Sequence, residues 1–188
     1  VQRHIKSLQE RECSLESTYS AESKLGLIYQ QAGRSLGAEP VLGRLYQNQV
    51  DLQGEMNEDT VATATKLMAV YTDLENHIQA QRFGLIAVNG YTALFGGDHY
   101  DTAVAVANLA YAYEAAGDSD LALKYLDSST DLFRRLGYPR YAATNLNKAG
   151  NIFHGQGDYS LAKESFESAV ELCESVYGVE HSETMVNK

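Results

Sequence analysis

Three asparagines carry side-chain chemistry that stands out in this sequence: Asn108, Asn147 and Asn151. Each amide offers both a hydrogen-bond donor and an acceptor, which suits the unpaired backbone groups of an extended peptide. Asn147 and Asn151 are four residues apart, so on a helix they share one face. Asparagine is a mediocre helix former, so a cluster in the middle of helices needs an explanation. The amides are either ordinary solvated surface groups or a clamp for a peptide backbone.

Residue types that do covalent or metal chemistry show no comparable pattern. Gly96-Gly97-Asp98 is not a phosphate loop, because no Gly-Lys-Ser/Thr follows it. Cys13 and Cys173 fit packing better than nucleophilic catalysis. The histidines lack the spacing of a metal site, such as two on one helical turn; they are His4, His77, His99, His154 and His181. We therefore expect no catalytic residue, no metal site, no cofactor and no enzymatic activity.

The charge balance bears on the class of partner. The chain has 188 residues with 15 basic and 25 acidic side chains, a formal net charge of −10. Proteins that bind nucleic acid concentrate Lys and Arg because counterion release drives that affinity, so we expect no nucleic-acid partner. No stretch approaches the roughly 20 apolar residues that a bilayer span requires, so we expect no membrane partner. An acidic surface either keeps a protein in solution or attracts a basic partner.

The start of the chain and its cysteines indicate context. Val1-Gln2-Arg3-His4 lacks the apolar core and cleavage pattern of a signal peptide, and it lacks a methionine. We therefore expect a fragment of a longer protein. Two cysteines argue against a disulfide scaffold and favour buried thiols in a reducing compartment. The expected location is cytoplasmic.

The elements that must position these residues recur along the chain. The segments that begin at Leu25, Leu67 and Leu109 and end in a tyrosine are 42 residues apart, and Ala149 to Phe153 follows 40 residues later. A second series keeps the same steps: Ala38, Ala80, Ala122 and Ala162. A third series differs by at most one residue per step: Gly54, Gly96, Gly137 and Gly178. Independent series that share one step indicate an internal structural repeat.

Helical spacing of apolar residues and near absence of strand alternation predict an all-α fold. Each repeat is expected to be two antiparallel helices joined by a tight turn. One such hairpin cannot bury its apolar face alone, whereas stacked neighbouring hairpins can. The expected helices are 2–15, 18–32, 36–53, 58–74, 77–95, 100–116, 119–136, 140–156 and 159–177, with another from 182. The chain is then a single array, with the second helix of a truncated repeat at 1–16, full repeats at 17–56, 57–98, 99–139 and 140–180, and the start of a further repeat at 181–188.

Small and capping residues have distinct expected roles. Gly26, Ala110 and Gly150 are expected where two helices cross closely. Gly33, Gly117 and Gly157 suit the left-handed cap that ends a helix. Asp118 and Asp158 are each expected to cap the start of the helix that follows them, and Asp59 and Asp101 the starts of the first helices of their repeats.

These residues resemble the tetratricopeptide repeat. The hallmark spacing is carried by Leu25-Gly26, Tyr29, Gly33, Ala38 and Leu42, and again by Leu109-Ala110, Tyr113, Gly117, Ala122 and Leu126. The step of about 42 residues and the Gly-x-x-His turns that begin at Gly96 and Gly178 are similar to the kinesin light chain subgroup. The second repeat departs from the pattern, because Glu75 replaces the turn glycine and Gly84 replaces a large apolar residue.

The resemblance implies a right-handed α-α superhelix whose first helices line a concave groove for a peptide or protein segment. The expected groove residues are Lys66, Asn108, Tyr111, Asn147, Lys148 and Asn151. Lys24, Lys66 and Lys148 share one repeat position, so they are either ordinary surface lysines or a basic ladder that suits an acidic peptide. The carboxylate clamp of chaperone-binding repeats needs a lysine one place earlier, where this chain has Ser23, Thr65, Ala107 and Asn147.

We therefore expect a non-enzymatic interaction scaffold that binds an extended peptide or protein segment. One alternative is a sensor or regulatory domain of a larger signalling protein. Another is a self-assembly module, in which exposed end repeats pair between chains as a homo-oligomer, because incomplete hairpins leave apolar faces uncovered.

Overall fold

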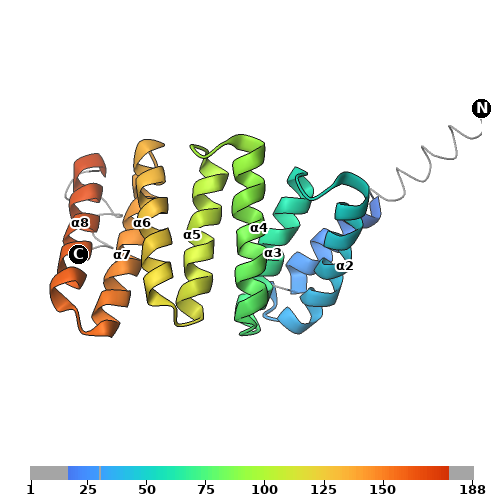
Figure 1. The fold of residues 1–188 in the computed structure, drawn as a ribbon, viewed down its shortest axis with the longest axis horizontal. Helices are drawn as coiled ribbons and strands as arrows, with labels where there is room; N and C mark the ends of the chain where they lie inside the picture. The colour runs from blue at the N-terminus through green and yellow to red at the C-terminus, as the bar shows by residue number, and fades with distance from the viewer. Residues whose placement is uncertain (1–16, 30, 178–188) are drawn as a thin grey trace, which may run out of the picture. The chain divides into compact units, whose positions relative to one another are not determined.

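The computed structural model describes residues 17–29 and 31–177, and within them every regular element is a helix (Figure 1). A first helix covers residues 17–29. The others are α2 (Ser35–Gln53), α3 (Glu58–Asp73), α4 (His77–Phe95), α5 (Tyr100–Ala115), α6 (Ser119–Arg135), α7 (Pro139–Gln156) and α8 (Tyr159–Tyr177). The ends of α2 to α8 lie within one residue of the expected ends. The helices expected at 2–15 and from 182 lie outside the described residues.

Contacts divide the chain into two compact units, Val1–Phe83 and Gly84–Lys188, with the boundary inside α4. In the first unit α2 packs on α3. In the second unit α5, α6, α7 and α8 pack in chain order, and Figure 1 shows them standing side by side. The predicted all-α helical-repeat fold is confirmed. Among the described helices, none is long and apolar enough to cross a membrane.

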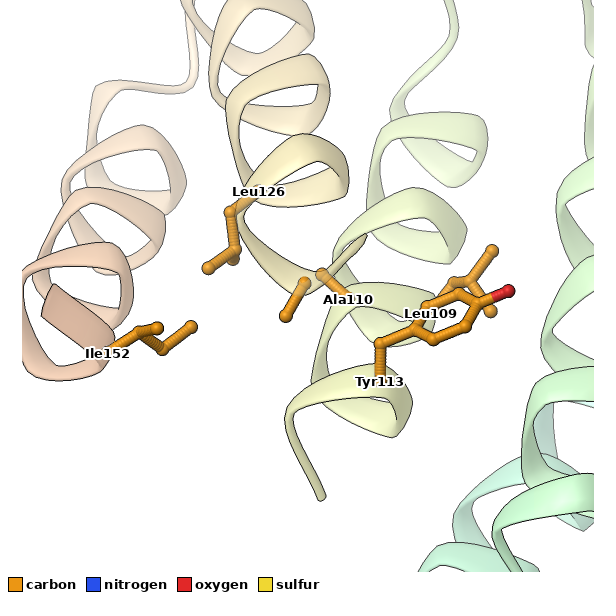
Figure 2. Close-up of a cluster of buried hydrophobic side chains, with 6 residues drawn as sticks. Leu109, Ala110, Tyr113, Leu126 and Ile152 are labelled. Atoms are coloured by element: carbon orange, nitrogen blue, oxygen red, sulfur yellow. The ribbon is translucent and has the colours of Figure 1, made fainter. Parts of the chain in front are cut away.

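The core of the second unit contains a cluster from three helices (Figure 2). Leu109, Ala110 and Tyr113 project from α5, Leu126 from α6 and Ile152 from α7. Ala110 and Leu109 have no exposed surface. Figure 2 shows the Ala110 methyl group between α5 and α6. A larger side chain at this position would push the two helices apart. The predicted close crossing at Ala110 is confirmed.

Two glycines mark further close crossings. A Cβ atom added at Gly150 would lie 2.8 Å from the ring of Phe166 on α8, closer than real contacts allow. A Cβ atom at Gly26 would collide with the side chain of Leu42 on α2. Glycine therefore fits both predicted crossings, because a side chain of the neighbouring helix already occupies the space that a Cβ atom would need.

One helix cap is as predicted and two are not. The Asp118 side chain accepts a hydrogen bond from the backbone N–H of Leu121, at 3.1 Å. The first helices of these two repeats are capped two residues earlier than expected, by Asn57 for α3 and His99 for α5. The backbone N–H groups of Asp59 and Asp101 donate to these caps. Both aspartates instead lie in the first turn, where a carboxylate interacts favourably with the helix dipole.

The turn between α3 and α4 stores backbone strain. Gly117 and Gly157 end their helices with positive φ angles of 79° and 84°. Glu75 takes the same left-handed conformation with φ of 56°. An L-residue with a Cβ atom pays for this conformation, whereas glycine does not. Glu75 therefore differs from the repeat pattern in its side chain only, and the turn keeps the backbone conformation of the other repeats.

We expect Glu75→Gly to raise the free energy of unfolding by about 1 kcal/mol, because it removes the left-handed strain. Urea unfolding followed by circular dichroism measures the change. Glu75→Ala is the matched control: it removes the carboxylate but keeps the Cβ atom, so it should give no such gain. Equal stabilisation by both variants would show that charge, not backbone strain, matters at this turn.

Candidate functional site

A hollow of about 400 Å³ opens on the second unit, between α5 and α7 with α6 behind them. The side chains that line it are mostly aromatic or apolar, with a few polar groups. They are Tyr100, Val104, Ala107, Asn108 and Tyr111 on α5, Phe133 on α6, and Arg140, Tyr141 and Thr144 on α7. Such a lining suits an apolar side chain whose neighbouring backbone groups meet polar partners.

Aromatic stacking gives this hollow a fixed wall. Phe133 is 1% exposed and stacks on Tyr141, with 5.1 Å between the ring centroids. Tyr100 meets Tyr141 edge-on at 5.6 Å. A hydrogen bond with Tyr141, together with burial, raises the pKa of Tyr100 to about 12. These ring contacts join residues of α5, α6 and α7 on one side of the hollow.

A chain of buried hydrogen bonds fixes Tyr111. Its hydroxyl donates to Asn145 Oδ1 at 3.2 Å, and Asn145 Nδ2 donates to Ser129 Oγ at 3.0 Å. Ser129 Oγ then donates to the carbonyl of Ala103 at 2.9 Å. Asn145 is 1% exposed and Ser129 is fully buried. Buried polar groups that are all paired specify one arrangement, so α5, α6 and α7 are held in one register at this point.

Sequence reasoning missed Asn145 as a member of this site. Its signal was its position between Ala142 and Ala149, at helical spacing on the face of α7 that packs inward. A buried asparagine needs hydrogen-bond partners, and the residues facing it supply them.

Lys148 has a partner within the unit. Its Nζ atom lies 3.2 Å from Glu114 Oε2 and 5.2 Å from the centroid of the Tyr111 ring. The ion pair and the cation–π contact hold the ammonium group beside the phenol. Lys148 is thus one half of an ion pair.

The predicted groove residues fall into three groups. Asn108 and Tyr111 line the hollow, and Lys148 contacts Tyr111. Asn147 is partly buried and Asn151 is exposed, both on α7 outside the lining of the hollow. Lys66 lies on α3 in the first unit, where its Nζ atom donates to Ser23 Oγ at 2.7 Å.

The cysteine and histidine side chains, which could serve catalysis or metal binding, do not line this hollow among the described residues. Cys173 is 1% exposed and packs in a core cluster with Ala143 and Ala169. Among the residues that the structure describes, no group of three or more His, Cys, Asp or Glu side chains is placed to hold a metal ion. Cys13, His4 and His181 lie outside those residues.

Paired helices that repeat along the chain define a helical-repeat protein. Two tetratricopeptide repeat sequence profiles match the chain, one over residues 59–135 and one over residues 143–183. The chain belongs to the tetratricopeptide repeat family. This fold is a protein-interaction fold, and the chain is an interaction scaffold of that class.

Curated relatives share the repeat region. A clustered mitochondria protein homolog from Aspergillus clavatus is 24% identical over 176 residues, which cover 93% of this chain and 14% of the relative. The homolog from Aspergillus oryzae matches with the same identity and the same coverage. The chain therefore spans about one seventh of the length of these relatives.

Solved structures confirm the fold. The nearly identical TPR-like repeats of a Podosopora anserina kinesin light chain-like protein match with a TM-score of 0.77 and 18% identity, over 93% of this chain and 82% of that one. BtubC from P. vanneervenii matches with a TM-score of 0.78 and 17% identity, over 87% and 66%. A Rap protein complexed with Competence and Sporulation Factor matches with a TM-score of 0.70 and 15% identity, over 85% and 43%. The predicted likeness to kinesin light chain-type repeats is confirmed.

Proposed function

We propose that the second unit binds an extended peptide or protein segment across α5 and α7. The observation that carries this proposal is the hollow lined by Phe133, Tyr100 and Tyr141, with Asn108 and Thr144 beside them. An apolar side chain of the ligand enters the hollow. Its flanking backbone groups find donors and acceptors in the amide of Asn108 and in the amides farther along α7, Asn147 and Asn151.

The electrostatics of this surface favour an acidic side chain next to the apolar one. Arg140 lines the hollow, and Lys148 lies over the Tyr111 ring. The Lys148 ammonium is shared with Glu114, so an acidic ligand competes with an existing ion pair and gains less than it would from an unpaired lysine. Acidic character is therefore a preference, and shape and backbone pairing supply most of the affinity.

The comparisons support a polypeptide ligand. A Rap protein with this fold was solved in complex with Competence and Sporulation Factor, so a repeat array of this fold can hold a partner. The relatives are about seven times longer than the matched region, which favours a second candidate function as the regulatory domain of a larger protein. We propose a cytoplasmic location for either role.

The test is a double substitution, Asn147→Ala with Asn151→Ala. Each truncation removes a hydrogen-bonding partner worth about 1 kcal/mol, so affinity for a captured partner should fall several-fold. Isothermal titration with a purified partner segment measures the change. Asn151 is exposed and Asn147 is partly buried, so the affinity is measured at temperatures where a thermal scan shows the double variant to be folded.

Asn89→Ala is the matched control, since Asn89 is an exposed asparagine on α4. It should leave partner binding unchanged. Normal binding by the double variant, or an equal loss with Asn89→Ala, would rule out this surface and favour the regulatory or self-assembly alternative.

A further inference from the structure

The first unit has a hollow of about 690 Å³ at the edge where its helices turn. It lies between the end of the helix at 17–29, the start of α2 and the end of α3. Tyr29 and Leu74 contribute apolar walls, and Arg34 and Leu36 line it from the start of α2. None of these residues belongs to the surface on α5 and α7, so the proposed function does not account for this hollow.

Leu36 is far more exposed than a leucine usually is. It is 82% exposed although it lines the hollow, and Ile78, one repeat step of 42 residues later, is 77% exposed. These are the two highest exposures among the large hydrophobic residues that the structure describes. A single apolar residue on a surface is ordinary, whereas exposed aliphatic residues beside an apolar hollow form a patch, and such patches mark interaction sites.

The equivalent hollow of the second unit has the opposite chemistry. It lies at the turn between α5 and α6, where Asp118 and Asp120 line it. Two repeat steps of 42 residues carry Arg34 onto Asp118 and Leu36 onto Asp120. The same place in the fold is thus acidic in one unit, and apolar with a cation in the other. Because the repeat folds with an aspartate at this place, packing within the unit gives no reason for the leucine.

Charged groups of both signs lie beside the apolar lining. Arg34 holds the N-cap position of α2 without a side-chain cap, and it has no ion pair among the residues that the structure describes. Glu75, in the turn that follows α3, is exposed and has no ion pair within the same described residues. Asp73 also lines the hollow, but its Oδ2 atom already accepts a hydrogen bond from Ser35 Oγ at 2.8 Å. The edge therefore offers one cation and one carboxylate for an external contact.

We propose that this turn edge is a self-association surface, on which two copies of the chain pair about a twofold axis. Leu36 of each copy enters the apolar hollow of the other, and Arg34 of each copy pairs with Glu75 of the other. A twofold contact uses one patch twice, so the patch must carry a protruding group, its receptor and both charges. This edge carries all four, which favours a second copy over a different protein. The contact is independent of the proposed function.

Sedimentation equilibrium of the whole chain at physiological ionic strength tests this surface. The average mass should rise with chain concentration from 20.7 kDa toward twice that value, because a small interface gives a weak dimer. It should not pass that value, since a twofold contact is closed. A mass that stays at 20.7 kDa up to millimolar concentration, or one that grows beyond the dimer, would overturn the proposal.

Leu36→Asp introduces the side chain that the third repeat holds at the equivalent position, Asp120. It should weaken dimerisation at least about tenfold, because it puts a charge into the apolar hollow. The melting temperature should not fall, since Leu36 is exposed and a carboxylate in the first turn of a helix interacts favourably with its dipole. Leu52→Asp is the matched control, because Leu52 is 59% exposed near the other end of α2 and should leave dimerisation unchanged. An equal effect of the two substitutions would place the contact elsewhere and overturn the proposal.

Charge reversal tests the pairing between copies. Arg34→Glu and Glu75→Arg should each weaken dimerisation about tenfold, because each brings like charges together across the contact. An equimolar mixture of the two variants should associate again, since every pair across the contact is then a glutamate with an arginine. Because neither single variant pairs with itself, this recovery requires that residue 34 of one copy meets residue 75 of the other. A mixture that stays monomeric would overturn the proposal even if Leu36→Asp behaved as expected.

Discussion

Phe133→Ala should lower the free energy of unfolding by about 3–5 kcal/mol, the usual cost of emptying a buried aromatic position. Phe133 is 1% exposed and packs with Ala103 and Ala142 in the core. It also supports the rings of Tyr141 and Tyr100. Removal of the ring leaves a cavity that two small alanines cannot fill. Urea unfolding followed by circular dichroism measures the loss.

Tyr159→Ala is the control for this substitution, because Tyr159 is 67% exposed on α8. Its truncation should cost less than about 1 kcal/mol, as surface substitutions usually do. A similar cost for both variants would mean that Phe133 does not anchor the core. Phe133 also lines the hollow between α5 and α7. Phe133→Ala should therefore also weaken partner binding, measured at temperatures where the variant stays folded.

Ala110→Leu should destabilise the chain by about 1–3 kcal/mol through overpacking. Ala110 has no exposed surface and lies among Leu126, Ile152 and Tyr113, as Figure 2 shows. A leucine there pushes α5 away from its neighbours or forces strained rotamers. The shift in melting temperature, measured by differential scanning calorimetry, reports the cost.

Ala115→Leu is the matched control for overpacking, since Ala115 is exposed near the end of the same helix. It should leave the melting temperature within a degree or two of the original. An unchanged melting temperature for Ala110→Leu as well would place the packing face of α5 elsewhere.

The fold was predictable because one physical constraint recurs along the chain. A small residue at Gly26, Ala110 and Gly150, with an aromatic residue three positions later, indicates which face of the helix packs, and the nearly constant step repeats that pattern. The ends of α2 to α8 followed from the turn residues to within one residue. The caps at Asn57 and His99 did not, because Asp59 and Asp101 looked like better capping residues two places later.

The candidate site was only partly predictable. Spacing on one helix placed Asn108 and Tyr111 on a common stripe, and both line the hollow. The partners of Tyr111 and Lys148 depend on the register between helices, which spacing along one helix does not determine. The bond from Tyr111 to Asn145 and the ion pair from Lys148 to Glu114 each join residues 34 positions apart. Only the packed structure shows that Lys148, a predicted groove residue, already pairs with Glu114.

The repeat also explains how one architecture provides two different surfaces. Packing positions such as Ala38, Ala80 and Ala122 stay small and fully buried, because each sits at a crossing. Other buried positions vary in chemistry, since Gln49 and Phe133 lie two repeat steps apart at equivalent places and one is polar while the other is aromatic. Side-chain chemistry therefore varies along the chain while the small residues at the helix crossings stay constant.

Site-specific photo-crosslinking shows most directly whether α5 and α7 of the second unit bind a polypeptide. A benzophenone amino acid replaces Asn108 inside the hollow or, as control, exposed Ser128 on α6. Mass spectrometry then identifies what is crosslinked in cell extract. One recurrent partner segment should be crosslinked from position 108, and excess original chain should compete with this crosslink while the Asn147→Ala, Asn151→Ala variant should not. Equal crosslinking from positions 108 and 128, or equal competition by both chains, would contradict it.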